Sequence, residues 1–168
     1  FYDQNPIFAE KPNLNRNLYI NGFASVSALG ETASEVWEAY RNPKPNFSHL
    51  KLKNHSYPVS SVSKTIERKL EILKTENKSY AYLDKSVLLG ILASRNLMKS
   101  LNISLEDTGI NLGSSRGATG LFEEHHEKFL NEGKVSSRTS PSTTLGNLSS
   151  WVAQDIGSKG AVISHSIT

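Results

Sequence analysis

Apolar residues recur along most of the chain at the spacing of helices, and shorter apolar runs separate these stretches. The helical spacing predicts helices over residues 32–40, 63–74, 80–101, 121–129 and 145–156. Alternating or continuous apolar runs predict strands over residues 18–26, 108–112 and 161–168. Strands that alternate with helices favour an α/β layered fold with a mostly parallel or mixed sheet.

Turn and cap residues mark the ends of these elements. Thr32 followed by Glu35 is a capping box, and Gly157 is placed to end the last helix. Residues 1–16 contain two prolines and no apolar period, so we expect an N-terminal arm, with the domain spanning 17–168. Pro, Asn, Lys and His dominate residues 41–57, which predicts an exposed loop, and residues 139–144 form a polar stretch.

Composition narrows the functional classes. With 168 residues, 37% of them hydrophobic, the chain suits one compact domain or part of one. A net charge of +3 on scattered lysines does not favour nucleic-acid binding. The absence of cysteine excludes disulfides, zinc-thiolate sites and thiol nucleophiles within these residues. No apolar run approaches the length of a membrane span, so we expect a soluble, cytoplasmic protein without membrane attachment.

Three patterns could carry chemistry, and each also has a structural explanation. The glycine-rich turn 113–120 could bind an anion, but it lacks the endings of known nucleotide loops and also suits a tight strand-to-helix connection. The cluster 123–127, with adjacent histidines, is more typical of a solvated helix face than of a metal site. No serine lies in a hydrolase elbow, and His165 is more typical of a packed strand residue than of a catalytic base.

Several segments, in order, resemble the N-terminal part of β-ketoacyl synthases. Residues 19–30 (YINGFASVSALG) resemble the opening strand of these condensing enzymes, and residues 32–40 their first helix. The segments 109–118 (GINLGSSRGA) and 140–144 (SPSTT), followed by the 157–160 turn (GSKG), match further family segments. The resemblance covers about residues 18–168 and depends on the order and spacing of the motifs.

The resemblance implies a thiolase-like layered α/β/α fold, of which this chain would be the incomplete N-terminal half. It implies a β-ketoacyl synthase that joins an acyl thioester to malonyl on acyl carrier protein by decarboxylative Claisen condensation, in fatty-acid or polyketide-type biosynthesis. The family's nucleophilic cysteine would follow Thr168, and its two histidines would lie in the other half. We therefore expect no catalytic residue, metal or cofactor in these 168 residues, and no activity from them alone.

The same resemblance implies a substrate pocket and partners. Arg116, Thr139 and Thr168 match positions that line the family's acyl pocket, and Arg116 stands where many relatives carry an aliphatic residue. An unpaired buried arginine is costly, so it requires a carboxylate partner, a polar substrate or another orientation. We expect acyl carrier protein as a partner, and a homodimer or a ketosynthase-type heterodimer formed through the final strand. Two alternatives remain: a non-catalytic chain-length-factor-like partner of a ketosynthase, and a nucleotide-binding α/β domain.

Overall fold

The computed structural model of the protein describes residues 17–42, 44–101, 103 and 105–165. The expected N-terminal arm, 1–16, lies outside these residues, as do the last three residues of the chain. The helices and strands are α1 (Ala33–Arg41), β1 (Ser48–Leu52), β2 (His55–Val59), α2 (Lys64–Glu76), the 3-10 helix η1 (Tyr80–Tyr82), α3 (Lys85–Met98), β3 (Ile110–Gly113), α4 (Thr119–Glu132), α5 (Thr139–Thr143), α6 (Asn147–Ile156) and β4 (Val162–His165).

Helix α3 is the centre of the hydrophobic core. Val87, Leu88 and Ile91 are fully buried there, because α2 supplies one neighbouring apolar face and α6 another. Gly90 leaves room for Val152 of α6, whose Cγ2 would lie 3.5 Å from an added Cβ. The absence of a side chain at Gly90 therefore leaves space for α6 to pack against α3.

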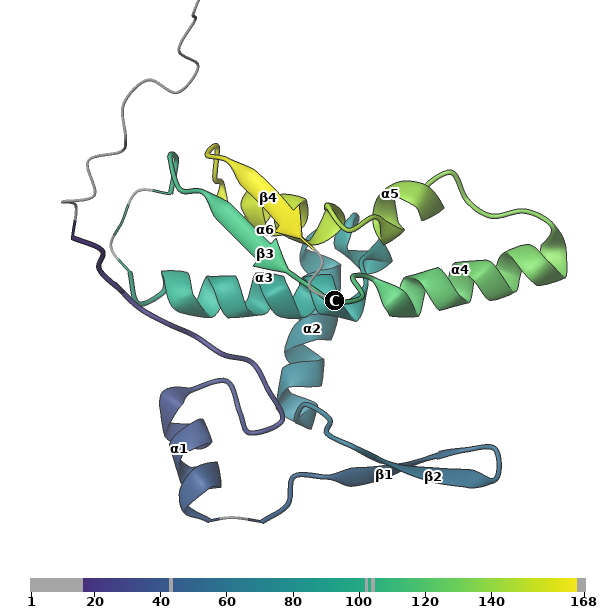
Figure 1. Ribbon diagram of the computed structural model, residues 1–168, viewed down its shortest axis with the longest axis horizontal. Coiled ribbons are helices and arrows are strands. Elements are labelled where there is room, and N and C mark those ends of the chain that lie inside the picture. The colour runs from purple at the N-terminus through teal and green to yellow at the C-terminus, as the bar shows by residue number, and fades with distance from the viewer. Residues whose placement is uncertain (1–16, 43, 102, 104, 166–168) are drawn as a thin grey trace, which may run out of the picture.

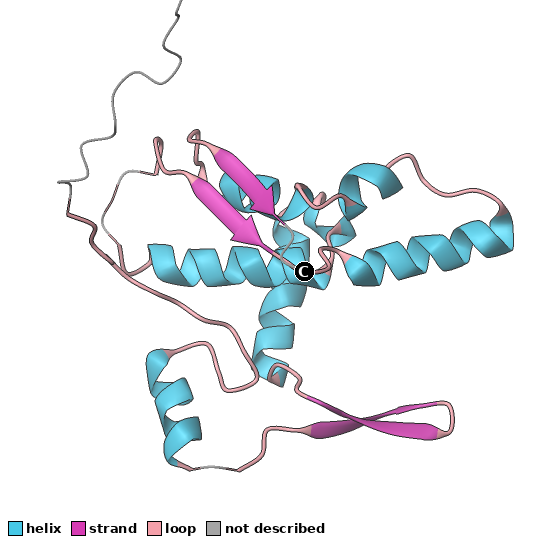
Figure 2. Ribbon diagram, in the orientation of Figure 1, coloured by secondary structure: helices cyan, strands magenta, loops and turns pink. Residues whose placement is uncertain are grey.

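Strands β3 and β4 form a two-stranded parallel sheet that lies beside α3 and α6 (Figures 1 and 2). Ile110 pairs with Val162, and Leu112 pairs with Ser164. Ile110 and Leu112 pack against the core, so one face of the pair is partly covered by helices. Parallel strands joined through helices confirm the predicted α/β class over this part of the chain.

The predicted cap residues mark the helix boundaries as expected: Thr32 precedes α1, and Gly157 follows α6. Thr32 accepts a hydrogen bond from the Glu35 amide (3.2 Å), and the Glu35 carboxylate accepts one from the Thr32 amide (3.1 Å). The backbone amides of Glu31 and Thr32, which both donate to the Glu35 carboxylate, lower the pKa of that group. Gly157 has the left-handed conformation (φ 74°) and terminates α6.

The strand predicted over residues 18–26 is wrong. This segment runs extended along the molecule without pairing to another described strand, and only the bridge between Ser27 and Gly30 follows it. Most of its apolar side chains lie in solvent, with Leu18 98% and Ile20 91% exposed, whereas Val26 is half-buried against the core. An apolar run forms a strand only where a neighbour supplies hydrogen bonds, and the described residues provide none here.

The loop predicted over residues 41–57 is also wrong in part. Strands β1 and β2 pair antiparallel there, around a turn in which Lys53 has a positive φ of 52°. Figure 1 shows this hairpin projecting from the rest of the molecule. Apart from Val59, its residues are exposed on both faces, so no buried face existed to produce an apolar alternation in the sequence.

Two further boundaries differ from the predictions. The long helix expected over residues 80–101 is divided, because Leu83 is extended between η1 and α3 and Asp84 caps the second part. The polar stretch 139–144 contains the short helix α5, in which Ser142 and Thr143 hydroxyls donate to the Thr139 carbonyl. The apolar period that predicts a helix is absent from this stretch, so the sequence did not indicate this helix.

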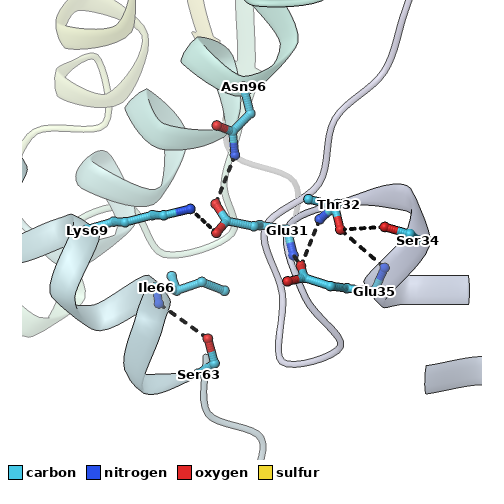
Figure 3. A network of polar contacts seen from close by, with 8 residues as sticks. All are labelled: Glu31, Thr32, Ser34, Glu35, Ser63, Ile66, Lys69 and Asn96. Carbon is cyan, nitrogen blue, oxygen red and sulfur yellow. Dashed lines mark hydrogen bonds and ion pairs between the residues drawn. The ribbon is translucent and has the colours of Figure 1, made fainter. Parts of the chain in front are cut away.

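A buried acidic residue attaches the N-terminal segment to the core helices (Figure 3). The Glu31 side chain is 7% exposed, pairs with the Lys69 ammonium of α2 and accepts a hydrogen bond from Asn96 of α3 (3.2 Å). These contacts join segments that are 38 and 65 residues apart. They position α1, which has no buried residue of its own.

Among the described residues, no helix has both the length and the apolar character needed to cross a bilayer.

Candidate functional site

The glycine-rich turn connects β3 to α4 and is held by its own hydroxyl groups. Ser114 Oγ accepts a hydrogen bond from the Gly117 amide (2.9 Å), and Thr119 Oγ1 donates to the Arg116 carbonyl (3.1 Å). Gly117 has a positive φ of 61°, which explains a glycine at that position. The turn is thus a tight strand-to-helix connection.

Asp84 occupies the place where the turn could have bound an anion. Its Oδ1 accepts from the amide (2.8 Å) and hydroxyl (2.7 Å) of Ser86, and its Oδ2 accepts from the Leu121 amide of α4 (3.1 Å). Asp84 is 9% exposed. A buried carboxylate at a helix N-terminus repels a phosphate, so this geometry disfavours the nucleotide-binding alternative.

The three predicted substrate-pocket residues differ from one another in location and exposure. Arg116 is exposed in the turn, and its guanidinium forms no ion pair with a described residue. Thr139 begins α5 and is half-buried, and its hydroxyl oxygen is enclosed without a hydrogen-bond partner. Thr168 lies outside the described residues. The Thr139 hydroxyl, which has no hydrogen-bond partner, forms no bond to Arg116.

A pocket of about 410 Å³ lies next to Thr139 without including it. It is formed by the turn after α2, the region of η1, the start of α5 and the middle of α6. Four of its lining residues are aromatic or apolar, two are cations and two are serines. The lining residues are Lys78, Ser79, Tyr82, Leu83, Arg138, Pro141, Ser142 and Trp151.

A buried polar network lies behind the aromatic wall. The Tyr80 ring meets the Trp151 ring edge to face, with centroids 5.9 Å apart, and its hydroxyl donates to Asp155 (2.7 Å). The Asp155 side chain, 2% exposed, also accepts three bonds from the Arg95 guanidinium, at 3.2 Å, 2.9 Å and 2.7 Å. Arg95 extends to Glu76 as well (2.6 Å). The network connects α2, η1, α3 and α6.

This network shifts the pKa values of two of its members. Burial, and then the Asp155 carboxylate, raise the pKa of Tyr80 to about 12. The hydrogen bonds to Asp155 are the main cause of a raised pKa for Arg95. Tyr80 therefore remains a protonated donor across the neutral range, and the network supports the pocket wall without supplying a base.

The described residues contain no group of acidic and histidine side chains that could hold a metal ion. In the 123–127 cluster, the His126 ring lies parallel to that of Phe122 with centroids 6.1 Å apart. His165 is half-buried on β4. These placements agree with the structural explanations of the histidines.

Sequence reasoning missed most of the pocket. It assigned Trp151 to a helix face and Tyr80 to the start of a long helix, but Tyr82, Lys78 and Arg138 received no role. The contacts that assemble the site connect residues 60 and 75 positions apart, such as Arg95 and Tyr80 with Asp155. The spacing of residues within a helix or strand does not predict contacts between residues so far apart in the sequence.

Comparison with known proteins identifies the architecture. No protein-family model matches the chain. Among solved structures, the ishigamide ketosynthase/chain length factor matches 87% of this chain with a TM-score of 0.70 and 13% identity. A β-ketoacyl synthase from Burkholderia phymatum matches 88% of it with a TM-score of 0.62 and 14% identity. The chain spans 38% of the length of each of these structures. The chain therefore has the thiolase-like fold of ketosynthases, over part of that fold's length.

Proposed function

We propose that this chain supplies the N-terminal part of a β-ketoacyl synthase-type subunit. The observation that carries the proposal is the likeness of fold to ketosynthases over 87% of the chain. The matching order of the sequence motifs supports it independently. The reaction would be decarboxylative condensation of an acyl thioester with malonyl on acyl carrier protein, with a nucleophilic cysteine after Thr168. These 168 residues contain no cysteine.

The exposed apolar surface of the N-terminal segment supports the need for further polypeptide. Ile20, Phe23 and Trp37 are 91%, 82% and 62% exposed. Of these, Phe23 and Trp37, together with Tyr40, line an open hollow of about 730 Å³ beside α1. Contiguous exposed apolar surface of this kind marks a protein contact. We infer that it contacts the rest of a ketosynthase-type fold, and that a homodimer or heterodimer forms from such subunits.

The experiment is a condensation assay with acyl and malonyl groups loaded on acyl carrier protein. The 168-residue chain alone should form neither an acyl-enzyme thioester nor a condensed product, because it has no thiol. A longer gene product that contains this chain should form both. Replacement of a cysteine after Thr168 by alanine in that product should abolish both. Acyl transfer by the 168 residues alone would contradict the proposal.

A chain-length-factor-like partner is the alternative function. It is favoured by one of the fold neighbours, which is named as a ketosynthase/chain length factor. In this case the position after Thr168 would hold glutamine or another residue that cannot form a thioester. The residue encoded at that position, read from the gene, separates the two functions.

Arg116, Thr139 and Thr168 remain our proposed substrate-pocket residues. The enclosed Thr139 hydroxyl, which lacks a partner, supports a position that faces a group outside these residues. The exposed Arg116 fits a contact with such a group as well. Acyl carrier protein as the partner and a cytoplasmic location stay predictions.

A further inference from the structure

Two cations of the 410 Å³ pocket have no carboxylate partner among the described residues. Lys78 follows α2, and Arg138 immediately precedes α5. The Arg138 guanidinium carbon lies 4.6 Å from the centroid of the Tyr82 ring, so a cation–π contact holds it against the pocket wall. An acidic group in the pocket would therefore find one positive charge already positioned and a second nearby.

The acidic residues of the network behind the pocket are already engaged with Arg95. Asp155 is 2% exposed and bonded to Arg95 and to the Tyr80 hydroxyl. Glu76 pairs with the other side of the Arg95 guanidinium. Because these carboxylates are held by Arg95, they are not free to neutralise the cations of the pocket. The charge offered to a ligand is positive.

The apolar walls are also held in place before any ligand binds. The edge-to-face contact with Tyr80 fixes Trp151, and the Tyr80 hydroxyl is itself fixed by Asp155. Tyr82 and Leu83 provide further walls, and the Ser142 hydroxyl is engaged with the Thr139 carbonyl (3.1 Å). Preformed aromatic walls lower the cost of ordering a site on binding.

We propose that this pocket binds a small aromatic carboxylate. Its ring would contact Tyr82, Leu83 and Trp151, and its carboxylate would pair with Lys78 and Arg138. The volume of about 410 Å³ is within the range of ligand pockets, about 300–1,000 Å³. The proposal goes beyond the condensing function and does not depend on it, because every group involved lies in the described residues.

The test is titration of the 168-residue protein with naphthalene-2-carboxylate, followed through the indole N–H resonances by NMR. The chain contains two tryptophans, and Trp37 lies in the separate hollow beside α1, so it is an internal control. The Trp151 resonance should shift saturably with a Kd at or below about 1 mM, while that of Trp37 stays unchanged. Naphthalene-2-carboxamide, which has no charge, should bind at least about threefold more weakly.

Charge-removing variants separate recognition of the carboxylate from apolar binding. Arg138→Gln and Lys78→Gln should each weaken binding of the carboxylate about three- to tenfold and leave binding of the carboxamide unchanged. Lys99→Gln changes a lysine of the other hollow and should have no effect. Unchanged dispersion of the amide spectrum shows that each variant is folded. Equal binding of carboxylate and carboxamide, a shift of Trp37 instead of Trp151, or no saturation would each overturn the proposal.

Discussion

Gly160 lies so close to the backbone of Thr108 that a single added carbon does not fit. A Cβ at this position would be 2.5 Å from the Thr108 carbonyl oxygen, and neither backbone can move without disturbing the entrance to β3 and β4. We predict that Gly160→Ala lowers the free energy of unfolding by about 2 kcal/mol or more. Urea denaturation of the wild type and the variant measures this change in the free energy of unfolding.

Gly109 provides a matched control on the facing segment. A Cβ there would lie 3.5 Å from the Ala161 carbonyl oxygen, an ordinary van der Waals distance. Gly109→Ala should change the free energy of unfolding by less than about 1 kcal/mol. Equal effects of the two substitutions would mean that the approach of Gly160 to Thr108 is not the constraint.

The Tyr80 hydroxyl stabilises the protein in a way that is lost at alkaline pH. Its pKa is about 12, above the ordinary value of 10.0, so the folded state holds this proton more tightly than the unfolded state. The stabilisation is complete below pH 10 and is lost as the pH rises through about 12. Tyr80→Phe should cost about 1–2 kcal/mol at neutral pH, through loss of the bond to Asp155.

The measurement compares unfolding of wild-type protein and Tyr80→Phe from neutral pH to pH 12. The difference in free energy of unfolding should shrink across the alkaline range. The wild type loses the stabilisation from the Tyr80 hydroxyl as that group deprotonates, and the variant lacks this hydroxyl at every pH. Tyr82→Phe is the control, since the Tyr82 side chain is 57% exposed. A difference that stays constant to pH 12 contradicts the prediction.

Among the elements, those with local signals were predictable and those that need a distant partner were not. The capping box at Thr32 and the apolar spacing of α2 and α3 place helices correctly, because both act within a few turns. The apolar segment 18–26 also had the pattern of a strand, but pairing depends on a neighbour that the described residues lack. The hairpin β1–β2 had no apolar alternation, since neither face is buried.

Asp84 joins two helices, so its removal should affect both. We predict that Asp84→Ala destabilises the protein by about 2 kcal/mol, because α3 loses its cap at Ser86 and the Leu121 amide of α4 loses its acceptor. Hydrogen exchange should accelerate in the first turn of α4 as well as in that of α3.

Ser63→Ala is the comparison for this prediction. Ser63 caps α2 alone, through the Ile66 amide (3.3 Å), and its loss should cost about 1 kcal/mol. Exchange should then accelerate in α2 and not in α4. If Asp84→Ala leaves the first turn of α4 as protected as in the wild type, the bond to Leu121 does not hold α4 to α3.

For the molecule as a whole, the fold could be predicted but the pocket could not. The order of the motifs indicated a ketosynthase-like chain, and fold neighbours with a TM-score of 0.70 or 0.62 agree with it. The pocket instead depends on side chains brought together from α2, η1, α5 and α6. Fold follows from the sum of many local preferences, whereas a site depends on where a few distant side chains meet.

The exposed apolar segment gives a final prediction at this scale. Ile20 and Phe23, 91% and 82% exposed, contribute little to the folded chain but offer apolar surface to another molecule. We predict that the 168-residue chain self-associates as its concentration rises. Ile20→Ser combined with Phe23→Ser should reduce the association while changing stability by less than about 0.5 kcal/mol per site.

Sedimentation velocity over a concentration series measures this association, and Leu130→Ser is the control. Leu130 is also apolar and exposed (69%), but it lies on α4, away from the N-terminal segment. If the N-terminal segment is the contact surface, only the double substitution will shift the sedimentation coefficient toward that of the monomer. If Leu130→Ser has the same effect, association reflects general apolar exposure, and the contact assigned to residues 18–26 loses its support.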